Sequence, residues 1–317
     1  MTEAPQQTLA LRTLTDLVEI VPSLLGFHPD CSLVLLAIED GVLAVTARVD
    51  LDEVGRHATA AAMAPLLEQH PDATFVGLAF CEHPERAWWV LDDVDAALPS
   101  TAPRMLAHVD GERWYDHPAD EGTPYDAWGS VHLAEAAWAG RPVRRSRAEL
   151  ARLLEPTRTP AEVTASLERV AARGERLGEV LAEARALVAG HDDAPGELDL
   201  DEATVLCLAS HDDDFLDEAL LSTTADNADS RVALWAQVVG SSVPNCAGGG
   251  LVAVGVASWV GGGGALTSLC LEALDGRPGP AHWVAFLEMV NRHAISPKRW
   301  EELREAMAAA EAGALVS

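Results

Sequence analysis

The sequence predicts an α/β domain, a mixed β-sheet with packed helices, followed by an α-helical C-terminal domain. The first half of the chain alternates short β-rich runs with helical segments, and Asp-Gly turns join two pairs of these runs. Beyond residue 146 the β-rich runs cease, and capping boxes and prolines mark successive helices. Apolar residues make up 49% of the 317 residues, enough for two cores at roughly 100–200 residues a domain.

The α/β domain is expected over residues 13–140, with the element order β-β-α-β-α-β-β after a short entry helix. Thr15-Asp16 begins that entry helix, and Pro22 and Gly26 end it. The expected segments are a hairpin of 32–38 and 42–51, a helix over 54–69, a strand over 74–80, a helix from Pro84, a hairpin of 104–109 and 112–115, a loop over 116–130 and a short helix over 131–139.

A helical connector is expected over residues 141–189, with the domain boundary near 140–160. Ser146 with Glu149, and Thr159 with Glu162, have the spacing of capping boxes. Apolar residues from Val163 to Val188 alternate steps of four and three, which predicts one long helix with a heptad-like seam. We favour packing of this helix within its own bundle over a dimeric coiled coil.

Residues 190–199 are interpreted as a linker, and residues 200–312 as the α-helical domain. Its helices are expected near 200–210, 213–222, 230–243, 247–260, 265–274, 281–293 and 297–312. The uncharged stretch 251–271 is long enough for a membrane span. Because the glycines at 261–264 interrupt it, two short buried helices joined by a glycine turn are the preferred interpretation.

Charge and cysteine usage limit the possible partners and the compartment. The formal net charge is −28, from 22 basic and 50 acidic residues, which disfavours direct binding to nucleic acid or anionic lipid. An acidic mimic of DNA is a remote alternative. Five cysteines without C-x-x-C spacing, and an N-terminus without signal-peptide features, predict a cytoplasmic protein with free thiols.

The loop that enters the sheet contains the first group of candidate site residues. His28, Asp30 and Ser32 lie together before a predicted strand and are the residue types of a Ser/His/Asp hydrolase. The candidate binding residues are Phe27, Arg48, Asp50 and Trp114.

A structural role for this loop is the favoured interpretation, because the chain has no G-x-S-x-G nucleophile elbow. In that interpretation Gly26 and Pro29 shape a turn and Phe27 fills the core. Arg48 and Asp50 fall on one face of a strand, where they are expected to form an ion pair.

The segment from His108 to His132 is the second candidate. Its imidazoles and carboxylates are suitable ligands for zinc, manganese or iron, but no helical His spacing fixes them, so a solvated acidic loop is favoured. Its aromatic residues either line a pocket or, as we favour, cover a sheet edge. We predict no metal and no cofactor.

Two further motifs have structural interpretations. The aspartate-rich runs 191–193 and 211–214 are expected to cap helices. The glycine runs 248–250 and 261–264 are expected to form tight turns between helices, since no lysine or arginine stands beside them to bind phosphate.

Several motifs resemble an actinobacterial family, domain of unknown function 4192. The resemblance is carried by the opening segment from Asp16 to Val34 and by 47–51, 110–114, 121–124, 146–150 and 232–287. One departure stands at Gly263, where the family tends to have aspartate. The resemblance implies a cytoplasmic protein from a high-GC Gram-positive bacterium and implies no activity.

Two functions follow as hypotheses. The first is a non-catalytic protein-interaction or adaptor module, whose acidic surface and helical face bind a basic or amphipathic protein partner. The alternative is a hydrolase or small-ligand-binding enzyme with its site at the N-terminal strand ends. Partner, substrate and oligomeric state are left open by the sequence.

Overall fold

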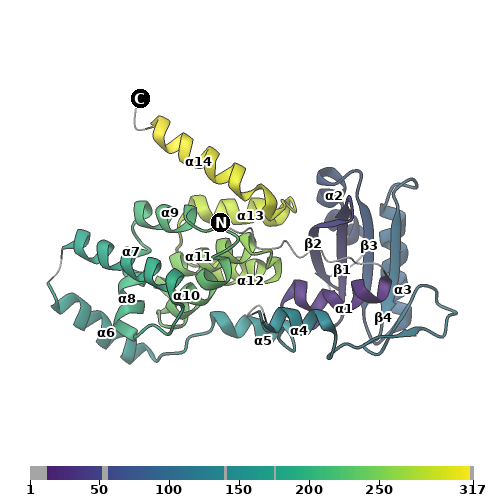
Figure 1. The fold of residues 1–317 in the computed structure, drawn as a ribbon, viewed down its shortest axis with the longest axis horizontal. Coiled ribbons are helices and arrows are strands. Elements are labelled where there is room, and N and C mark those ends of the chain that lie inside the picture. The colour runs from purple at the N-terminus through teal and green to yellow at the C-terminus, as the bar shows by residue number, and fades with distance from the viewer. Residues whose placement is uncertain (1–12, 52–55, 139–140, 175, 315–317) are drawn as a thin grey trace. The chain divides into compact units, whose positions relative to one another are not determined.

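The computed structural model describes residues 13–51, 56–138, 141–174 and 176–314 (Figure 1). It confirms the predicted fold class, a mixed sheet with packed helices followed by helices alone. The chain divides into two compact units between Arg147 and Ala148. Of the predicted helix ends, Val54 and Ala139 lie outside the described residues.

The first unit contains a six-stranded sheet within the described residues, in the order β2-β1-β3-β4-β5-β6. Its strands are β1 (Ser32–Glu39), β2 (Val42–Asp50), β3 (Thr74–Phe80), β4 (Arg104–Val109), β5 (Arg113–Tyr115) and β6 (Thr123–Pro124). Its helices are α1 (Leu14–Leu25), α2 (Arg56–Gln69), α3 (Pro84–Ala97) and α4 (Val131–Trp138), and α5 (Arg147–Ala151) spans the boundary.

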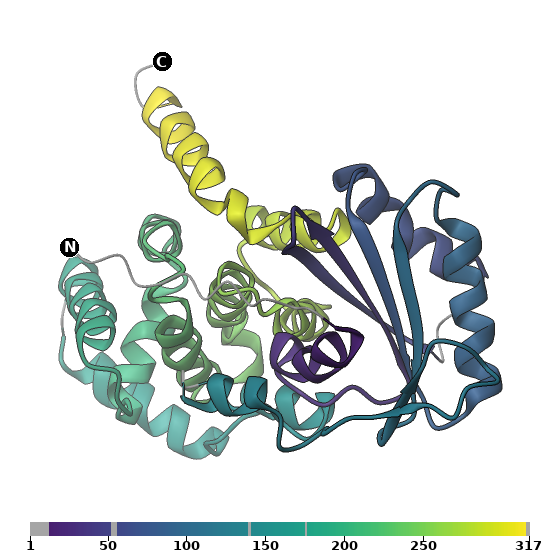
Figure 2. The ribbon, with the colours of Figure 1, turned by 45° about the vertical axis from the view of Figure 1, so that its right-hand side comes forward.

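Pairing in the sheet is antiparallel except between β3 and β4, which run parallel. Both predicted hairpins form, β1 with β2 and β4 with β5. The continuous apolar run from Ser32 to Ala37 is buried along its whole length, as expected for a strand covered on both faces. In Figure 2, α2 and α3 lie on one side of this sheet and α1 lies on the other.

Helix α1 begins and ends where its capping residues dictate. Thr13 and Asp16 form a reciprocal capping box, and the helix begins at Leu14, one residue before the predicted start at Thr15-Asp16. Gly26 ends the helix with φ of 78°, a left-handed conformation that glycine adopts without strain. Pro22 lies inside α1 and does not end it, contrary to the prediction.

The second unit is helical throughout its described residues. Its elements are η2 (Arg152–Leu154), α6 (Pro160–Ala172), α7 (Leu177–Asp193), α8 (Leu200–Ala209), α9 (Asp213–Leu221), α10 (Ala228–Gly240), η3 (Pro244–Cys246), α11 (Gly248–Val260), α12 (Gly264–Leu274), α13 (Ala281–Arg292), η4 (Pro297–Arg299) and α14 (Trp300–Ala314). The predicted helices from residue 200 onward are confirmed, with no end shifted by more than three residues. Among the described residues, no helix combines the length and apolarity needed to cross a bilayer.

Helix α11 is the centre of this unit, because every residue from Gly248 to Val260 is buried. Glycine permits this burial by close approach: a Cβ added at Gly249 would lie 2.6 Å from Ser210, and one at Gly255 would lie 2.8 Å from Leu287. The glycines at 248–250 therefore serve packing inside a helix, which corrects the prediction of a turn there. The predicted turn at 261–264 is confirmed, with φ of 83° at Gly262.

The predicted single helix from Pro160 to Val188 is wrong, because the structure divides it into α6 and α7. Gly174, at φ of 67°, ends the first helix in the left-handed conformation. The capping box of Thr159 with Glu162 is confirmed at the start of α6. The heptad-like seam therefore belongs to two shorter helices, both of which pack on α8.

The predicted linker from residue 190 begins too early, because α7 continues to Asp193. His191 and Asp192 consequently lie at the C-terminal end of a helix and do not cap a helix start, contrary to the prediction. Asp192 pairs with Arg231 of α10 through two charged hydrogen bonds of 2.7 and 2.6 Å, and the Arg231 side chain is 4% exposed. A carboxylate at this end opposes the helix dipole, so the guanidinium is what stabilises it there. Asp212, by contrast, caps α9 as predicted, accepting a hydrogen bond from the Phe215 amide.

This ion pair predicts a large effect of substitution. Asp192→Ala leaves the Arg231 guanidinium buried without its counter-charge, and we expect the free energy of unfolding of the helical unit to fall by about 3–5 kcal/mol. Urea denaturation followed by far-ultraviolet circular dichroism measures this loss. Asp193→Ala is the matched control, because Asp193 is exposed one residue further on. Equal stability of the two variants would contradict the assigned role of Asp192.

Candidate functional site

Three segments meet at one edge of the sheet because of the strand register. Ser32 at the start of β1 pairs with Phe80 at the end of β3, and Phe80 lies beside Val109 at the end of β4. The chain before β1 and the chain after β3 and β4 are therefore neighbours. The carboxyl ends of parallel strands are where α/β sheets commonly bind ligands.

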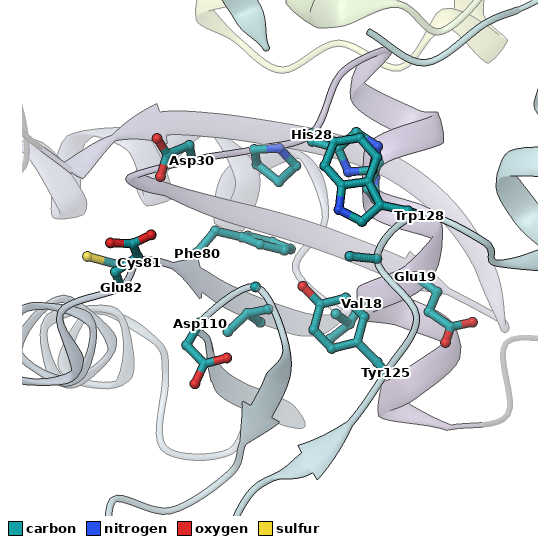
Figure 3. Close-up of a pocket in the computed structure, with 15 residues that line it drawn as sticks. Val18, Glu19, His28, Asp30, Phe80, Cys81, Glu82, Asp110, Tyr125 and Trp128 are labelled. Atoms are coloured by element: carbon teal, nitrogen blue, oxygen red, sulfur yellow. The ribbon is translucent and has the colours of Figure 1, made fainter. Parts of the chain in front are cut away.

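A cavity of about 160 Å³ lies at this edge (Figure 3). Five segments of the first unit contribute to it: α1, the loop before β1, and the segments that follow β3, β4 and β6. The lining residues are Val18, Glu19, Pro22, His28, Pro29, Asp30, Phe80, Cys81, Glu82, Val109, Asp110, Gly111, Tyr125, Ala127 and Trp128. The wall is therefore aromatic and apolar, with four carboxylates among its residues.

His28 and Trp128 form one side of the cavity as a stacked pair. Their ring centroids are 3.8 Å apart with the planes inclined by 31°, and Figure 3 shows the two rings overlapping. The His28 amide donates to the Arg144 carbonyl at 3.0 Å, and the Arg144 amide donates to Gly26 at 2.8 Å, which fixes the loop. Burial lowers the pKa of His28, because desolvation disfavours the charged imidazole. The His28 ring is therefore neutral at pH 7.

Tyr125 contributes a neutral hydroxyl to the cavity. Its phenol oxygen points toward the middle of the lining residues in Figure 3. Burial, together with the nearby charges of Asp110 and Glu19, raises the pKa of Tyr125 to about 12. No hydrogen bond to the Tyr125 hydroxyl or to the His28 ring is made by the residues that the structure describes. Both groups are therefore available to a ligand.

The four carboxylates differ in how firmly they are held. Burial raises the pKa of Asp110, but hydrogen bonds from the Glu112 and Arg113 amides and from the Tyr115 hydroxyl outweigh it and lower that pKa overall. Glu19 accepts one hydrogen bond, from the Asp126 amide at 3.2 Å. The other two carboxylates, Asp30 and Glu82, belong to exposed residues. Three hydrogen bonds thus hold the Asp110 carboxylate in place, whereas the Asp30 and Glu82 side chains are exposed to solvent.

His108 supports the floor of the site from below the lining layer. It is 3% exposed, and its Nε2 lies 2.8 Å from the Cys81 carbonyl oxygen. Its ring stacks on Tyr115 with centroids 5.2 Å apart, and Tyr115 in turn donates to Asp110. This series of contacts connects the end of β3 to the turn after β4, and so links the positions of Cys81 and Asp110 in the wall.

The structure separates the residues proposed from sequence. Two of the candidate catalytic residues, His28 and Asp30, line the cavity. Ser32 does not: it is 0% exposed, and its hydroxyl donates to the Asp30 carbonyl at 2.6 Å. The backbone pairing of β1 with β3 places the Ser32 side chain inside the domain.

The four candidate binding residues also lie outside the lining. Phe27 is 1% exposed, and the Arg48 guanidinium lies 5.5 Å from the centre of its ring. Arg48 also pairs with Asp50 on the same strand, as expected. Trp114 donates from its indole nitrogen to the Thr15 hydroxyl at 3.1 Å, which ties β5 to α1. The contacts of Arg48 with Phe27 and of Trp114 with Thr15 each join two segments of the fold, whereas Arg48 and Asp50 pair within β2.

The second candidate segment contributes to the same cavity as the first. Asp110, Tyr125 and Trp128 line it together with His28, although about 80 to 100 residues separate them in the sequence. Sequence analysis noted these aromatic residues but favoured their role as cover over a sheet edge. In the part of the chain that the structure describes, no three His, Cys, Asp or Glu side chains are grouped to hold a metal ion.

Two lining segments lie outside the candidate segments: Val18-Glu19 of α1, and Phe80-Cys81-Glu82 at the end of β3 and just after it. A signal for the second of these exists in the sequence, because Cys81-Glu82 directly follows an apolar strand. The first had none, since Val18 is an ordinary apolar position of an amphipathic helix.

The fold and the cavity together define a two-unit protein: a mixed-sheet domain with a strand-end pocket, followed by a helical domain. The family model described as Domain of unknown function (DUF4192) matches residues 15–297, and the chain belongs to this family. Comparison with curated proteins and with solved structures found no match.

The departure at Gly263 has a local consequence in the structure. Its amide donates to the Ser258 carbonyl at 2.7 Å, and the Ser258 hydroxyl donates to the Gly263 carbonyl at 2.6 Å. A Cβ added at Gly263 would lie 2.6 Å from the Ser258 hydroxyl oxygen. In this chain glycine therefore permits the close turn that joins α11 to α12.

Burial of His28 predicts how the stability of the first unit depends on pH. The folded pKa is below the ordinary value of 6.5, so the unfolded chain takes up the proton first as pH falls. The contribution of His28 is therefore constant above about pH 6.5 and is lost between that pH and the lower folded pKa. A histidine NMR titration gives the folded pKa directly.

Substitution of His28 distinguishes its contribution to the pH dependence of stability from the contributions of the other histidines. We expect His28→Gln to lose less stability than the unsubstituted protein between pH 7.5 and pH 5.5, as measured by urea denaturation. His293→Gln, at an exposed position, should leave the pH dependence unchanged. A His28 titration midpoint at or above 6.5 contradicts this assignment.

Proposed function

We propose that the N-terminal unit is a binding domain for a small organic molecule, held in the cavity at the carboxyl ends of β3 and β4. The observation that carries this proposal is a cavity with an aromatic wall and two neutral polar groups, His28 and Tyr125, without hydrogen-bond partners among the described residues. Pockets of this composition, mostly apolar with a few orienting polar groups, are typical of ligand sites.

The volume of the cavity limits the size of the ligand. The cavity measures about 160 Å³. An engineered apolar cavity of roughly 150 Å³ accommodates one benzene molecule. A ligand that fills the space is therefore about one ring in size, or protrudes past Trp128, which is 64% exposed.

Binding is better supported than hydrolysis because the nucleophile candidates have other partners. The Ser32 hydroxyl is buried and bonded to a backbone carbonyl. The Cys81 side chain lines the cavity, but its sulfur accepts a hydrogen bond from the His83 amide at 3.4 Å. Within the described lining, no hydroxyl or thiol is hydrogen-bonded to the His28 ring, as a base-activated nucleophile requires.

Removal of one cavity wall provides the test. Small aromatic molecules, screened by saturation-transfer NMR against the full chain, are expected to bind, and Trp128→Ala is expected to weaken the best of them by about tenfold or more. Trp138→Ala is the matched control, because Trp138 is 94% exposed and lies outside the lining. Equal effects of the two substitutions, or no binding by any probe, would overturn the proposal.

A second candidate, an interaction module for a basic or amphipathic protein, is favoured by the surface of α4. Val131 is 61% exposed and Trp138 is 94% exposed. They are seven residues apart and so share one helix face. Two exposed apolar side chains, with the exposed Glu135 between them on the same face, suit a partner that presents both apolar and basic groups to a protein of net charge −28.

Paired purifications test this second candidate. The full chain and a Val131→Ser/Trp138→Ser variant are used as bait in extracts of the native host, at low and moderate salt. A stoichiometric basic protein that the variant fails to retain, and that dissociates as salt rises, is the expected result. Identical co-purifying proteins with both baits would remove the support for this candidate.

A further inference from the structure

We propose that the ligand of the strand-end cavity is a compact organic cation, an ammonium group attached to an aromatic or alkyl body of about one ring. This inference rests on the proposed function of the cavity and adds the chemical class of the ligand. Two features of the lining support it: the wall is aromatic, and four carboxylates surround the cavity without any lysine or arginine.

The charge around the cavity is entirely negative among its lining residues. Glu19, Asp30, Glu82 and Asp110 contribute four carboxylates, whereas the lining contains no lysine and no arginine. Figure 3 places Asp30 and Glu82 on one side, Asp110 below them and Glu19 on the opposite side. A bound cation would therefore have negative charge on several sides of it.

These carboxylates are not neutralised by the fold. In the described parts of the chain, none of the four forms an ion pair with arginine or lysine. The donors to Asp110 are two amides and a phenol, which are neutral groups that keep it ionised. Arg113, the arginine nearest to Asp110 in sequence, instead donates from its guanidinium to the carbonyls of Glu121 and Gly122, at 3.1 and 2.8 Å.

The aromatic wall suits the same ligand. Trp128, Tyr125 and Phe80 all line the cavity, and the faces of such rings attract cations, tryptophan most strongly. His28 is neutral, so it neither repels a cation nor attracts an anion. An anionic ligand would meet four like charges with no compensating donor beyond His28 and Tyr125, and this arrangement discriminates against it.

Three probes that share one ring and differ in charge test the inference: benzylamine, benzyl alcohol and benzoate. Their dissociation constants for the full chain are measured at pH 7 and low salt by titration calorimetry or saturation-transfer NMR. We expect benzylamine, protonated at this pH, to bind at least about tenfold more tightly than benzyl alcohol, and benzoate to be the weakest. Added salt should reduce the benzylamine advantage.

Charge-neutral variants locate the origin of the preference. Glu82→Gln and Asp30→Asn each remove one carboxylate from an exposed position in the lining. Each is expected to reduce the ratio of the benzylamine affinity to the benzyl alcohol affinity severalfold. Asp40→Asn is the matched control: it removes the same unit of charge in the turn at the other end of β1. The ratio of the benzylamine affinity to the benzyl alcohol affinity in this variant should equal that of the unsubstituted protein.

The outcomes separate this inference from the proposed function. Equal binding of benzylamine and benzyl alcohol, or tightest binding of benzoate, overturns the cation preference while the cavity remains a ligand site. An equal effect of Asp40→Asn and Glu82→Gln also overturns it, because the preference would then come from the net charge of the protein. If none of the three probes binds, both the ligand site and its preference are refuted.

Discussion

The parallel pairing of β3 with β4, beside an antiparallel β1, is the constraint on which the first unit depends. The carboxyl ends of two parallel strands lie at the same edge of a sheet, and an antiparallel neighbour begins at that edge. Ser32 of β1, Phe80 of β3 and Val109 of β4 therefore lie side by side. Interstrand hydrogen bonds cease at this edge, and the loops beyond it must satisfy their polar groups in other ways. Two of them do so with ring side chains: the buried His108 contacts the Cys81 carbonyl, and the half-buried Tyr115 donates to Asp110. The cavity lies between these loops, α1 and the segment after β6.

The electrostatics of the cavity follow from the depth of each group. His28 and Tyr125 are partly buried, and the same desolvation lowers the pKa of the first and raises the pKa of the second, so both are neutral. Asp110 is charged despite partial burial, since three neutral donors stabilise its carboxylate. Asp30 and Glu82 are exposed to solvent. The wall of the cavity is thus mostly apolar with two neutral polar groups, and four carboxylates lie among its lining residues.

Patterns local in sequence predicted most of the elements, and failures occurred where tertiary contacts decide. Apolar runs and Asp-Gly turns located both hairpins, a capping box located the start of α6, and helical patterns located α8 to α13. The heptad-like seam predicted one continuous helix through Gly174. In the structure Gly174 adopts a left-handed conformation and ends α6 there. The end of α7 was misplaced because Asp192 looks like a helix breaker until Arg231, 39 residues later, is known to pair with it. Likewise, His28 and Trp128 are 100 residues apart, and only the sheet register shows that two separate candidate segments form one cavity.

The same register determines which chemistry the site retains. A side chain at the first position of a buried strand is turned into the domain or out of it by the two-residue period of the strand, and for Ser32 this direction is inward. Its hydroxyl therefore completes the backbone of the entry loop and cannot reach a bound molecule. The Cys81 sulfur is likewise used by the turn into α3, where it accepts from the His83 amide. With the nucleophile candidates bonded into the fold, the groups that still face the cavity are aromatic faces, a neutral imidazole, a phenol and carboxylates. Such groups are suited to hold and orient a molecule by ring contacts, hydrogen bonds and charge, which is why we propose recognition in preference to covalent catalysis.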